Sequence, residues 1–355
     1  MQITKASVIP VALNLRRPVL LAGYPPVEAV TAIFLHLETR QGQSAWGCTV
    51  AHPQLTGETP ETALRACQEA ADLAVDLHPL NIEYSLGELN SRLPQLSPAV
   101  LCAFDLAFHD LLALAAGLPL YRLLGGYRNR IQTSATVDIA PVQESVEQAE
   151  ERARLGFRML KVKGGINPEE DVRRIKAIHR ALPDHILRLD ADGGYTVRQA
   201  LDVARALQAE LEMLEQPTPF GDLSALRQVT EQSPVPVLAD QSLTGPSSAL
   251  QLAAGQVVHG LSLKLATCGG LMCGRQVEAV ARAARLSVMV SCVIEPAMLV
   301  AAGLSLALSS PTVRYGDLDG FLDLDNDPSR PGFSLQDGWL VAAEVPGLGY
   351  TVELA

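Results

Sequence analysis

The chain has 355 residues, a hydrophobic content of 48% and a formal net charge of −11 at pH 7. This length predicts about two domains, and the acidic balance argues against nucleic acid and anionic membranes as partners, because both bind basic surfaces. The six cysteines include no CxxC pair, and the sequence shows neither a basic-then-apolar leader nor an apolar run of 18 residues. We therefore expect a soluble, cytoplasmic protein with reduced thiols.

The first 125 residues predict an α+β domain. The segments ITKASVIPVAL and AVTAIFLHLET alternate as antiparallel strands do, and the LRRPVLLAGYPP segment between them is rich in Pro and Gly and predicts a mobile loop. Helical patterns follow from Thr59 to Asp76 and from Pro98 to Ala116, and Gly117 stands where a helix C-cap is expected.

Residues 126–324 contain a repeat of short apolar runs, each ending in a polar residue and mostly followed by a helical segment. Successive run ends differ by 27, 25, 25, 24, 27 and 26 residues, by subtraction of their numbers. The run ends are Lys163, Asp190, Glu215, Asp240, Lys264, Ser291 and Asp317. Strands that alternate with helices at this period predict an α/β fold, a (β/α)8-type barrel, with the active site at the carboxyl ends of the strands.

The last segment, from about residue 325 to 355, returns to strand and turn patterns without a helix. We expect it to complete the first domain. The predicted division is therefore 1–125, completed by about 325–355, for the α+β domain and 126–324 for the barrel.

Three carboxylates, those of Asp190, Glu215 and Asp240, end three consecutive predicted strands. Clustered carboxylates repel one another unless a cation lies between them, and hard oxygen ligands favour Mg²⁺, with Mn²⁺ as an alternative. The other interpretation is that each acid caps the helix that follows it.

Lysines end two further strands. Lys161 and Lys163 are two residues apart on one strand and share a face, while Lys264 comes from the sixth strand, across the barrel. A buried lysine beside a divalent cation has a lowered pKa and can act as a general base near neutral pH. The alternative, a salt bridge to the carboxylates, is as good an interpretation for Lys161 as a contact with substrate.

Together these motifs resemble the enolase superfamily, in its muconate-lactonizing subgroup. The resemblance rests on KxK, DADGG, EQP, AD and SLKLATCGG, and it extends to FDLAFHDLLALAAGLPLYRLLGG and the closing PGLGY. It implies an enolase-like modified TIM barrel with an N-terminal capping domain. It also implies Mg²⁺ held by the three carboxylates, with Lys163 and Lys264 as bases and an Mg-stabilised enediolate, the pattern for which that superfamily is known.

Two further features resemble dipeptide epimerases such as L-Ala-D/L-Glu epimerase. One is DLDG, in which Asp317 and Asp319 share a face, and the other is HPQLTGET, similar to the loop that closes over the site in that family. The resemblance implies that the two acids hold the ammonium group of a dipeptide whose C-terminal residue is epimerised by 1,1-proton transfer. An acidic loop that caps a helix is the other interpretation of DLDG.

Three alternatives to a dipeptide epimerase stay open at this point. An N-acylamino acid racemase and an o-succinylbenzoate synthase or cycloisomerase would use the same enediolate, and a non-catalytic barrel would only bind a small ligand or metal. An acylated amine carries no charge for Asp317 and Asp319 to meet, and elimination needs only one base.

The residues expected to contact the substrate lie on several loops and strand ends. They are Lys161, Tyr24, Thr136, Ile294, Glu295 and Met298, in addition to the two acids of DLDG. Arg16 or Arg17 would favour an acidic side chain and Glu295 a basic or polar one, unless these are surface charges. The expected partners are a small-molecule dipeptide and further copies of the chain, as a homo-oligomer.

The chain departs from the family pattern at three positions. Gln241 stands in place of a usual acid, Asp192 where Asn is frequent, and Cys48 where many members have an acid. A neutral Gln241 removes one negative charge, which we expect to ease the deprotonation of Lys264 if the two lie close together.

Overall fold

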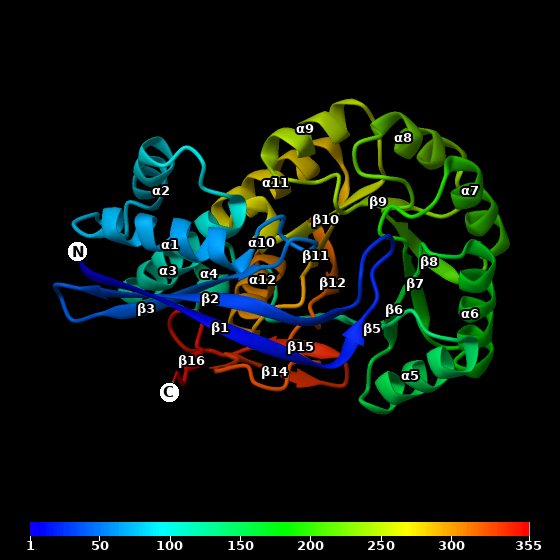
Figure 1. The fold of residues 1–355 in the computed structure, drawn as a ribbon, viewed down its shortest axis with the longest axis horizontal. Coiled ribbons are helices and arrows are strands. Elements are labelled where there is room, and N and C mark those ends of the chain that lie inside the picture. Colours follow the sequence, from blue (N-terminus) through cyan, green and yellow to red (C-terminus); the bar gives the residue numbers. More distant parts are fainter. Residues whose placement is uncertain (355) are drawn as a thin grey trace.

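The protein is described by a computed structural model covering residues 1–354. Its first domain is an antiparallel sheet in the order β1-β2-β3, packed against helices (Figure 1). The strands are β1 (Ile3–Val19), β2 (Val27–Thr39) and β3 (Ser44–Ala51), and the helices are α1 (Pro60–Ala74), α2 (Ile82–Arg92) and α3 (Pro98–Ala116). Thr59 caps α1 by accepting a hydrogen bond from Thr62 N, and Gly117 ends α3 with a φ of 67°. The expected strands and both expected helices are present, whereas β3 and α2 were not predicted.

The loop expected between the first two strands is shorter than predicted. β1 continues through the RRPV segment, and Val19 pairs with Val27 across a register shift that follows Asn14. Proline lacks the N–H of a ladder hydrogen bond but is tolerated on an edge strand, and β1 is the edge of this sheet. Only residues 20–26 remain as a loop.

The second domain contains eight parallel strands in consecutive order, as the repeat predicts. The strands are β5 (Ser134–Val137), β6 (Met159–Lys163), β7 (Ile186–Asp190), β8 (Leu211–Glu215), β9 (Val237–Ala239), β10 (Gly260–Lys264), β11 (Ser287–Ser291) and β12 (Val313–Asp317). A bridge between Thr133 and Gly316 brings the first and last strands together and nearly closes the barrel. All seven predicted run ends lie at, or directly after, the end of a strand.

Helices surround this barrel on its outside (Figure 1). They are α5 (Val142–Arg154), α6 (Pro168–Ala181), α7 (Val197–Ala206), α8 (Leu223–Gln232), α9 (Pro246–Ala254), α10 (Leu265–Cys268), α11 (Leu271–Ala284) and α12 (Ala297–Ser309). No helix follows β12 in the part of the chain that the structure describes.

The C-terminal segment returns to the first domain. It forms β13 (Ser329–Arg330), β14 (Phe333–Gln336), β15 (Trp339–Ala342) and β16 (Thr351–Val352), and β15 pairs with β4 (Arg130–Gln132), which follows α4 (Leu120–Leu123). Tyr350 Oη donates to Asp110 Oδ2 at 2.7 Å and accepts from Trp46 N at 2.6 Å, which joins the segment to α3 and β3. The division at residues 125 and 324 into folding units stays a prediction.

Helix α3 lies between the two domains. It is long and apolar enough to cross a membrane by length and composition, but 72% of that stretch is buried inside the protein. One side of the helix packs on β3, and it also contacts α10 and α11 of the barrel. Its apolar character is therefore that of a core helix that packs against both domains.

Candidate active site

Three carboxylates meet at the barrel mouth. Asp190 and Glu215 end β7 and β8, and Asp240 directly follows β9. Each has an oxygen within 4.8 Å of the others, and all three side chains are buried. Glu215 Oε1 has no hydrogen-bond partner, and burial, followed by repulsion from Asp190, raises the pKa of Glu215 to about 7. Oxygen ligands at this spacing, with one carboxylate oxygen free, fit a hard divalent cation.

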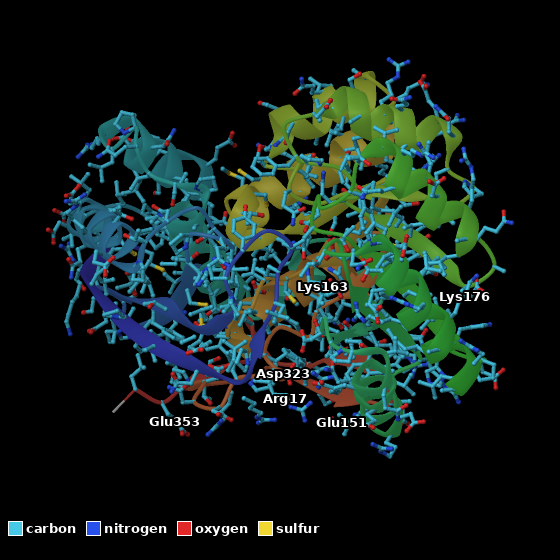
Figure 2. All side chains as sticks on the ribbon, turned by 45° about the vertical axis from the view of Figure 1, so that its right-hand side comes forward. Arg17, Glu151, Lys163, Lys176, Asp323 and Glu353 are labelled. Atoms are coloured by element: carbon cyan, nitrogen blue, oxygen red, sulfur yellow. The ribbon has the colours of Figure 1, made fainter. Side chains whose placement is uncertain are left out.

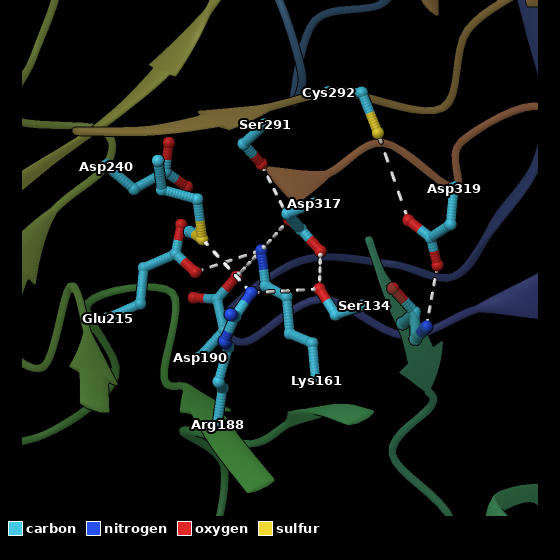
Figure 3. A network of polar contacts seen from close by, with 12 residues as sticks. Ser134, Lys161, Arg188, Asp190, Glu215, Asp240, Ser291, Cys292, Asp317 and Asp319 are labelled. Carbon is cyan, nitrogen blue, oxygen red and sulfur yellow. Dashed lines mark hydrogen bonds and ion pairs between the residues drawn. The ribbon is translucent and has the colours of Figure 1, made fainter. Parts of the chain in front are cut away.

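Lys161 lies among these acids (Figure 3). Its Nζ is 2.9 Å from Asp190 Oδ2, 3.0 Å from Glu215 Oε2 and 2.8 Å from Asp317 Oδ2. Among the protein groups alone, Lys161 therefore forms salt bridges with these acids, as one of its two interpretations predicts.

The two predicted bases lie at opposite ends of the row of acids. Lys163 Nζ, at the end of β6, is 2.9 Å from Asp190 Oδ2 and 2.8 Å from Asp192 Oδ2. Lys264 Nζ, at the end of β10, pairs with Asp240. Along the sheet from β6 to β10, five neighbouring strands thus end in one charged residue each, with a lysine first and last.

The protein groups alone do not lower the pKa of these lysines. Burial by itself would lower the pKa of both, but Asp190 and Asp192 outweigh it for Lys163, and Asp240 does so for Lys264, so that the pKa is raised. The expected lowering of the pKa applies to a lysine beside a divalent cation. Such a cation would compete with the lysine for the same carboxylates.

The contact that the structure gives Gln241 is on the side of Lys163, and the expected effect on Lys264 stays a prediction. Gln241 Nε2 donates to Asp192 Oδ1 at 3.0 Å, and Asp192 pairs with Lys163. The charges that act most on Lys264 are those of Asp240 and Lys161. The amide of Gln241 therefore orients Asp192, the partner of Lys163 that follows β7.

The two acids of DLDG point to different partners, although they are two residues apart (Figure 3). Asp317 accepts hydrogen bonds from Lys161 Nζ at 2.8 Å and from the hydroxyls of Ser134 and Ser291 at 2.6 Å each. Asp319 accepts hydrogen bonds from Thr136 N at 2.6 Å and from the Cys292 thiol at 3.9 Å.

No cation pairs with Asp319 among the described residues. Burial, followed by the charge of Asp317, raises the pKa of Asp319 to about 6. The carboxylate of Asp319 is therefore the freer of the two.

The predicted substrate contacts occupy different depths. Tyr24 is exposed in the 20–26 loop, Thr136 and Ile294 are half-buried, and Glu295 and Met298 are buried. Glu295 accepts a hydrogen bond from Val293 N, and burial raises its pKa to about 8.

The loop that carries Tyr24 reaches the barrel. Ala22 lies so close to Gly165 that a Cβ on this glycine would meet it at 3.0 Å. Gly165 is two residues beyond Lys163, so the loop covers the mouth beside this base.

Arg16 and Arg17 each have an acidic neighbour, and the charge of Arg17 also acts on Asp138, which follows β5. Arg16 Nε is 3.1 Å from Asp325 Oδ1, and an Arg17 guanidinium nitrogen is 3.6 Å from Glu151 Oε2. Figure 2 shows Arg17 and Glu151 near the outside of the molecule, and both pairs are exposed. The surface-charge interpretation fits Arg16, whereas a contact of Arg17 with the substrate stays a prediction.

Residues behind Lys163 form a network that the sequence did not reveal. Arg174 donates to the Lys163 carbonyl at 2.7 Å, and Asp171 Oδ2 accepts from Gly165 N at 2.9 Å and from Tyr195 Oη at 2.6 Å. Arg174 and Asp171 lie on one helix at a spacing of three, which in sequence looks like a surface ion pair. Only the placement of α6 against the strand ends distinguishes this buried network from a surface ion pair.

Comparisons with known proteins agree with this geometry. Residues 144–355 match the family model described as "Enolase C-terminal domain-like". The chain is 37% identical to the L-Lys-D/L-Arg epimerase of Desulforapulum autotrophicum over 95% of this chain and 96% of that protein.

Two solved structures have the same fold. The dipeptide epimerase of Methylococcus capsulatus, complexed with Mg and L-Arg-D-Lys, superposes with a TM-score of 0.93 at 34% identity over 99% of this chain and all of that one. The dipeptide epimerase of Enterococcus faecalis V583, complexed with Mg and L-Leu-L-Tyr, superposes with a TM-score of 0.95 at 31% identity and the same coverage. The three relatives named here are epimerases that act on dipeptides, and the chain belongs to the enolase superfamily, through its enolase C-terminal domain-like family.

Proposed function

We propose that this protein epimerises a dipeptide at its C-terminal residue by moving the α-proton from one face of the α-carbon to the other. The observation that carries the proposal is the pair Lys163 and Lys264 at the two ends of the carboxylate row. A 1,1-proton transfer needs one base on each side of the carbon, and this arrangement supplies them.

The carboxylates of Asp190, Glu215 and Asp240 would hold Mg²⁺, or Mn²⁺, at the mouth. When bound, the ion would bind the substrate carboxylate and offset the negative charge that develops as the proton leaves. Lys163 or Lys264 takes the α-proton, according to the configuration of the substrate. The lysine on the far side then delivers a proton from its Nζ, which completes the inversion.

Asp319 positions the dipeptide in the site by binding its N-terminal end. Its buried carboxylate, held by Thr136 N, would meet the ammonium group at the N-terminus of the dipeptide. An ammonium group stabilises the ionised form of Asp319, whose pKa burial raises to about 6. Asp317 would act through Lys161, with which it is paired.

We also propose that the preferred dipeptides carry cationic side chains. Asp138 follows β5 at the mouth, two residues after Thr136, where the charges of Asp323, Arg152, Lys163 and Arg17 act on it. Its backbone N–H and carbonyl are bonded to Gln148 and Arg174, while no donor among the described residues reaches its carboxylate. The relatives from Desulforapulum and Methylococcus, with Lys and Arg in their names or ligands, support the same class.

The test is deuterium uptake by a panel of dipeptides in ²H₂O with Mg²⁺, followed by mass spectrometry. We expect uptake at the α-carbon of the C-terminal residue, fastest for Lys- and Arg-containing dipeptides. Asp138→Asn should lower kcat/KM for these and leave Leu- and Ala-containing dipeptides little changed. Uptake confined to N-acylamino acids would instead establish a racemase, and a preference for apolar dipeptides would overturn the cationic assignment alone.

Cellular location and assembly belong to the same proposal. An acidic chain with six free cysteines suits the reducing cytoplasm. We propose a homo-oligomer, for which sedimentation of the purified protein is the direct test.

A further inference from the structure

The segment that follows Lys264 differs from the other strand ends of the barrel. α10 begins at the next residue, with Lys264 itself as its N-cap, and ends after one turn at Gly269. Gly269 and Gly270 have φ values of 99° and 93°, and α11 starts at Leu271. Lys264 is the last residue of β10 and is joined directly to this turn, so a displacement of the turn would also move the base.

The first domain holds this turn in place. Asp105, on α3, accepts hydrogen bonds from Leu271 N at 2.5 Å and from Met272 N at 3.2 Å. These are the first two backbone N–H groups of α11, whose own N-cap residue, Gly270, has no side chain to bind them. The carboxylate also meets the positive end of the α11 dipole.

The contact is tight and fully buried. Asp105 is 0% exposed, and His109 Nδ1 lies 3.3 Å from Asp105 Oδ1 and 2.9 Å from the Asp105 carbonyl. A Cβ at Gly270 would lie 2.5 Å from Asp105 Oδ2. The glycine therefore permits the carboxylate to reach the helix end.

Lys163 is held by different groups. Arg174 NH1 binds the Lys163 carbonyl, and Asp171 binds Gly165 N and Tyr195 Oη. These residues all belong to the barrel. The two bases thus have separate supports, one inside the barrel and one from α3.

We propose that Asp105 is a positioning residue for Lys264, so that helix α3 of the first domain controls the alignment of this base and does not act on Lys163. The inference rests on the proposed epimerase function, in which each base serves one epimer as proton acceptor. Proton transfer requires close alignment, and a misplacement of about 1 Å can cost on the order of a hundredfold in rate. Loosening the turn should therefore slow proton removal by Lys264 and spare removal by Lys163.

The experiment measures the rate of α-proton exchange in ²H₂O for the two epimers separately. The Lys264→Ala variant identifies which epimer depends on Lys264. In Asp105→Asn, exchange of that epimer should fall about tenfold or more, and exchange of the other should change by less than about twofold. Tyr195→Phe, which removes a support of Lys163, should shift the ratio of the two rates in the opposite direction.

Two further variants separate positioning from general damage. Asp222→Ala removes the N-cap of α8, where Asp222 Oδ1 accepts from Ala225 N at 2.9 Å, and should lower stability without changing the ratio. Gly270→Ala displaces Asp105 from the barrel side and should reproduce the bias. Amide hydrogen exchange offers a readout independent of activity: in Asp105→Asn, protection should fall over residues 265–274 and stay unchanged over 159–175.

The outcomes are distinct. Equal slowing of both epimers in Asp105→Asn and Gly270→Ala, or unchanged protection over residues 265–274, overturns the inference alone. Wild-type protein that exchanges neither epimer of any dipeptide overturns the proposed function, and with it the inference.

Discussion

Individual side chains at the mouth have separable tasks, and the lysines divide theirs by face. Lys163→Ala and Lys264→Ala should each abolish epimerisation, because one proton donor or acceptor is missing. Each variant should still exchange the α-proton of one epimer, a different one for each. Nuclear magnetic resonance of the α-proton in ²H₂O gives both rates, and loss of exchange from both epimers in both variants would contradict this division.

The next residue-scale prediction concerns the ammonium group. Asp319→Asn removes a buried negative charge opposite a cation, at a cost of a few kcal/mol on the scale for one partner of a buried charge pair. We expect kcat/KM to fall about a hundredfold or more on a free-amine dipeptide. An N-acetylated dipeptide has no charge at this end and should be unaffected or improved. Comparable losses on both substrates would show damage to the site as a whole.

Among the elements, the C-terminal segment makes stability depend on pH through Asp110. Burial raises the pKa of Asp110 to about 6 from an ordinary value of 3.8, against the opposing hydrogen bonds from Tyr350 and Leu348. The folded state therefore binds a proton more tightly than the unfolded state. The resulting stabilisation is complete below about pH 4 and is lost as pH rises through about 6.

Replacing Asp110 with Asn should flatten this dependence. Between pH 4 and pH 7 the wild-type protein should lose on the order of 2 kcal/mol more unfolding free energy than Asp110→Asn does. Urea denaturation at a series of pH values measures the difference. Parallel curves for the two proteins would mean that Asp110 titrates normally.

Elements also show where the sequence was sufficient. The spacing of the polar run ends predicted the strands β6–β12 and the mouth they share, because strand period and the position of a polar terminus are local features. The extent of β1 was missed because Pro18 suggests a loop in the sequence, whereas an edge strand also tolerates proline. Asp105 was unpredictable as a cap of α11 because its partners lie 166 and 167 residues away.

In the candidate site, too, local features were predictable from the sequence and long-range contacts were not. The sequence predicted Asp190, Glu215 and Asp240 as a group, and the structure brings them within ligand distance. It could not tell that Gln241 turns toward Asp192, or that Asp317 faces Lys161 while Asp319 does not. Side-chain direction beyond a strand end is set by the following loop, and period carries no information there.

For the whole molecule, metal binding should be coupled to folding. The three carboxylates come from separate strands and meet only in the folded barrel, so Mg²⁺ binds the native state in preference to the unfolded chain. At a concentration one hundred times Kd, the ion should add about 2.7 kcal/mol to stability. Thermal unfolding with and without Mg²⁺ measures this shift in Tm.

Asp190→Asn should remove the shift and remain folded, since the acids lie at the mouth and outside the packed layers. Full activity after exhaustive chelation would contradict a role for the ion.

The row of strand ends described above has a property that its members lack individually. From β6 to β10 the order is Lys163, Asp190, Glu215, Asp240, Lys264, and it is the same when taken backwards. An epimerase interconverts two configurations that are mirror images at the reacting carbon, so a palindromic row of charges about Glu215 presents equivalent surroundings to both. Two residues break this symmetry: Asp192 pairs with Lys163 alone, and Lys161 pairs with Asp190 but not with Asp240. Inequality between the forward and reverse barriers that originates in these charged strand ends should therefore depend on Asp192, with the amide of Gln241 that holds it, and on Lys161, in addition to the separate supports of the two bases.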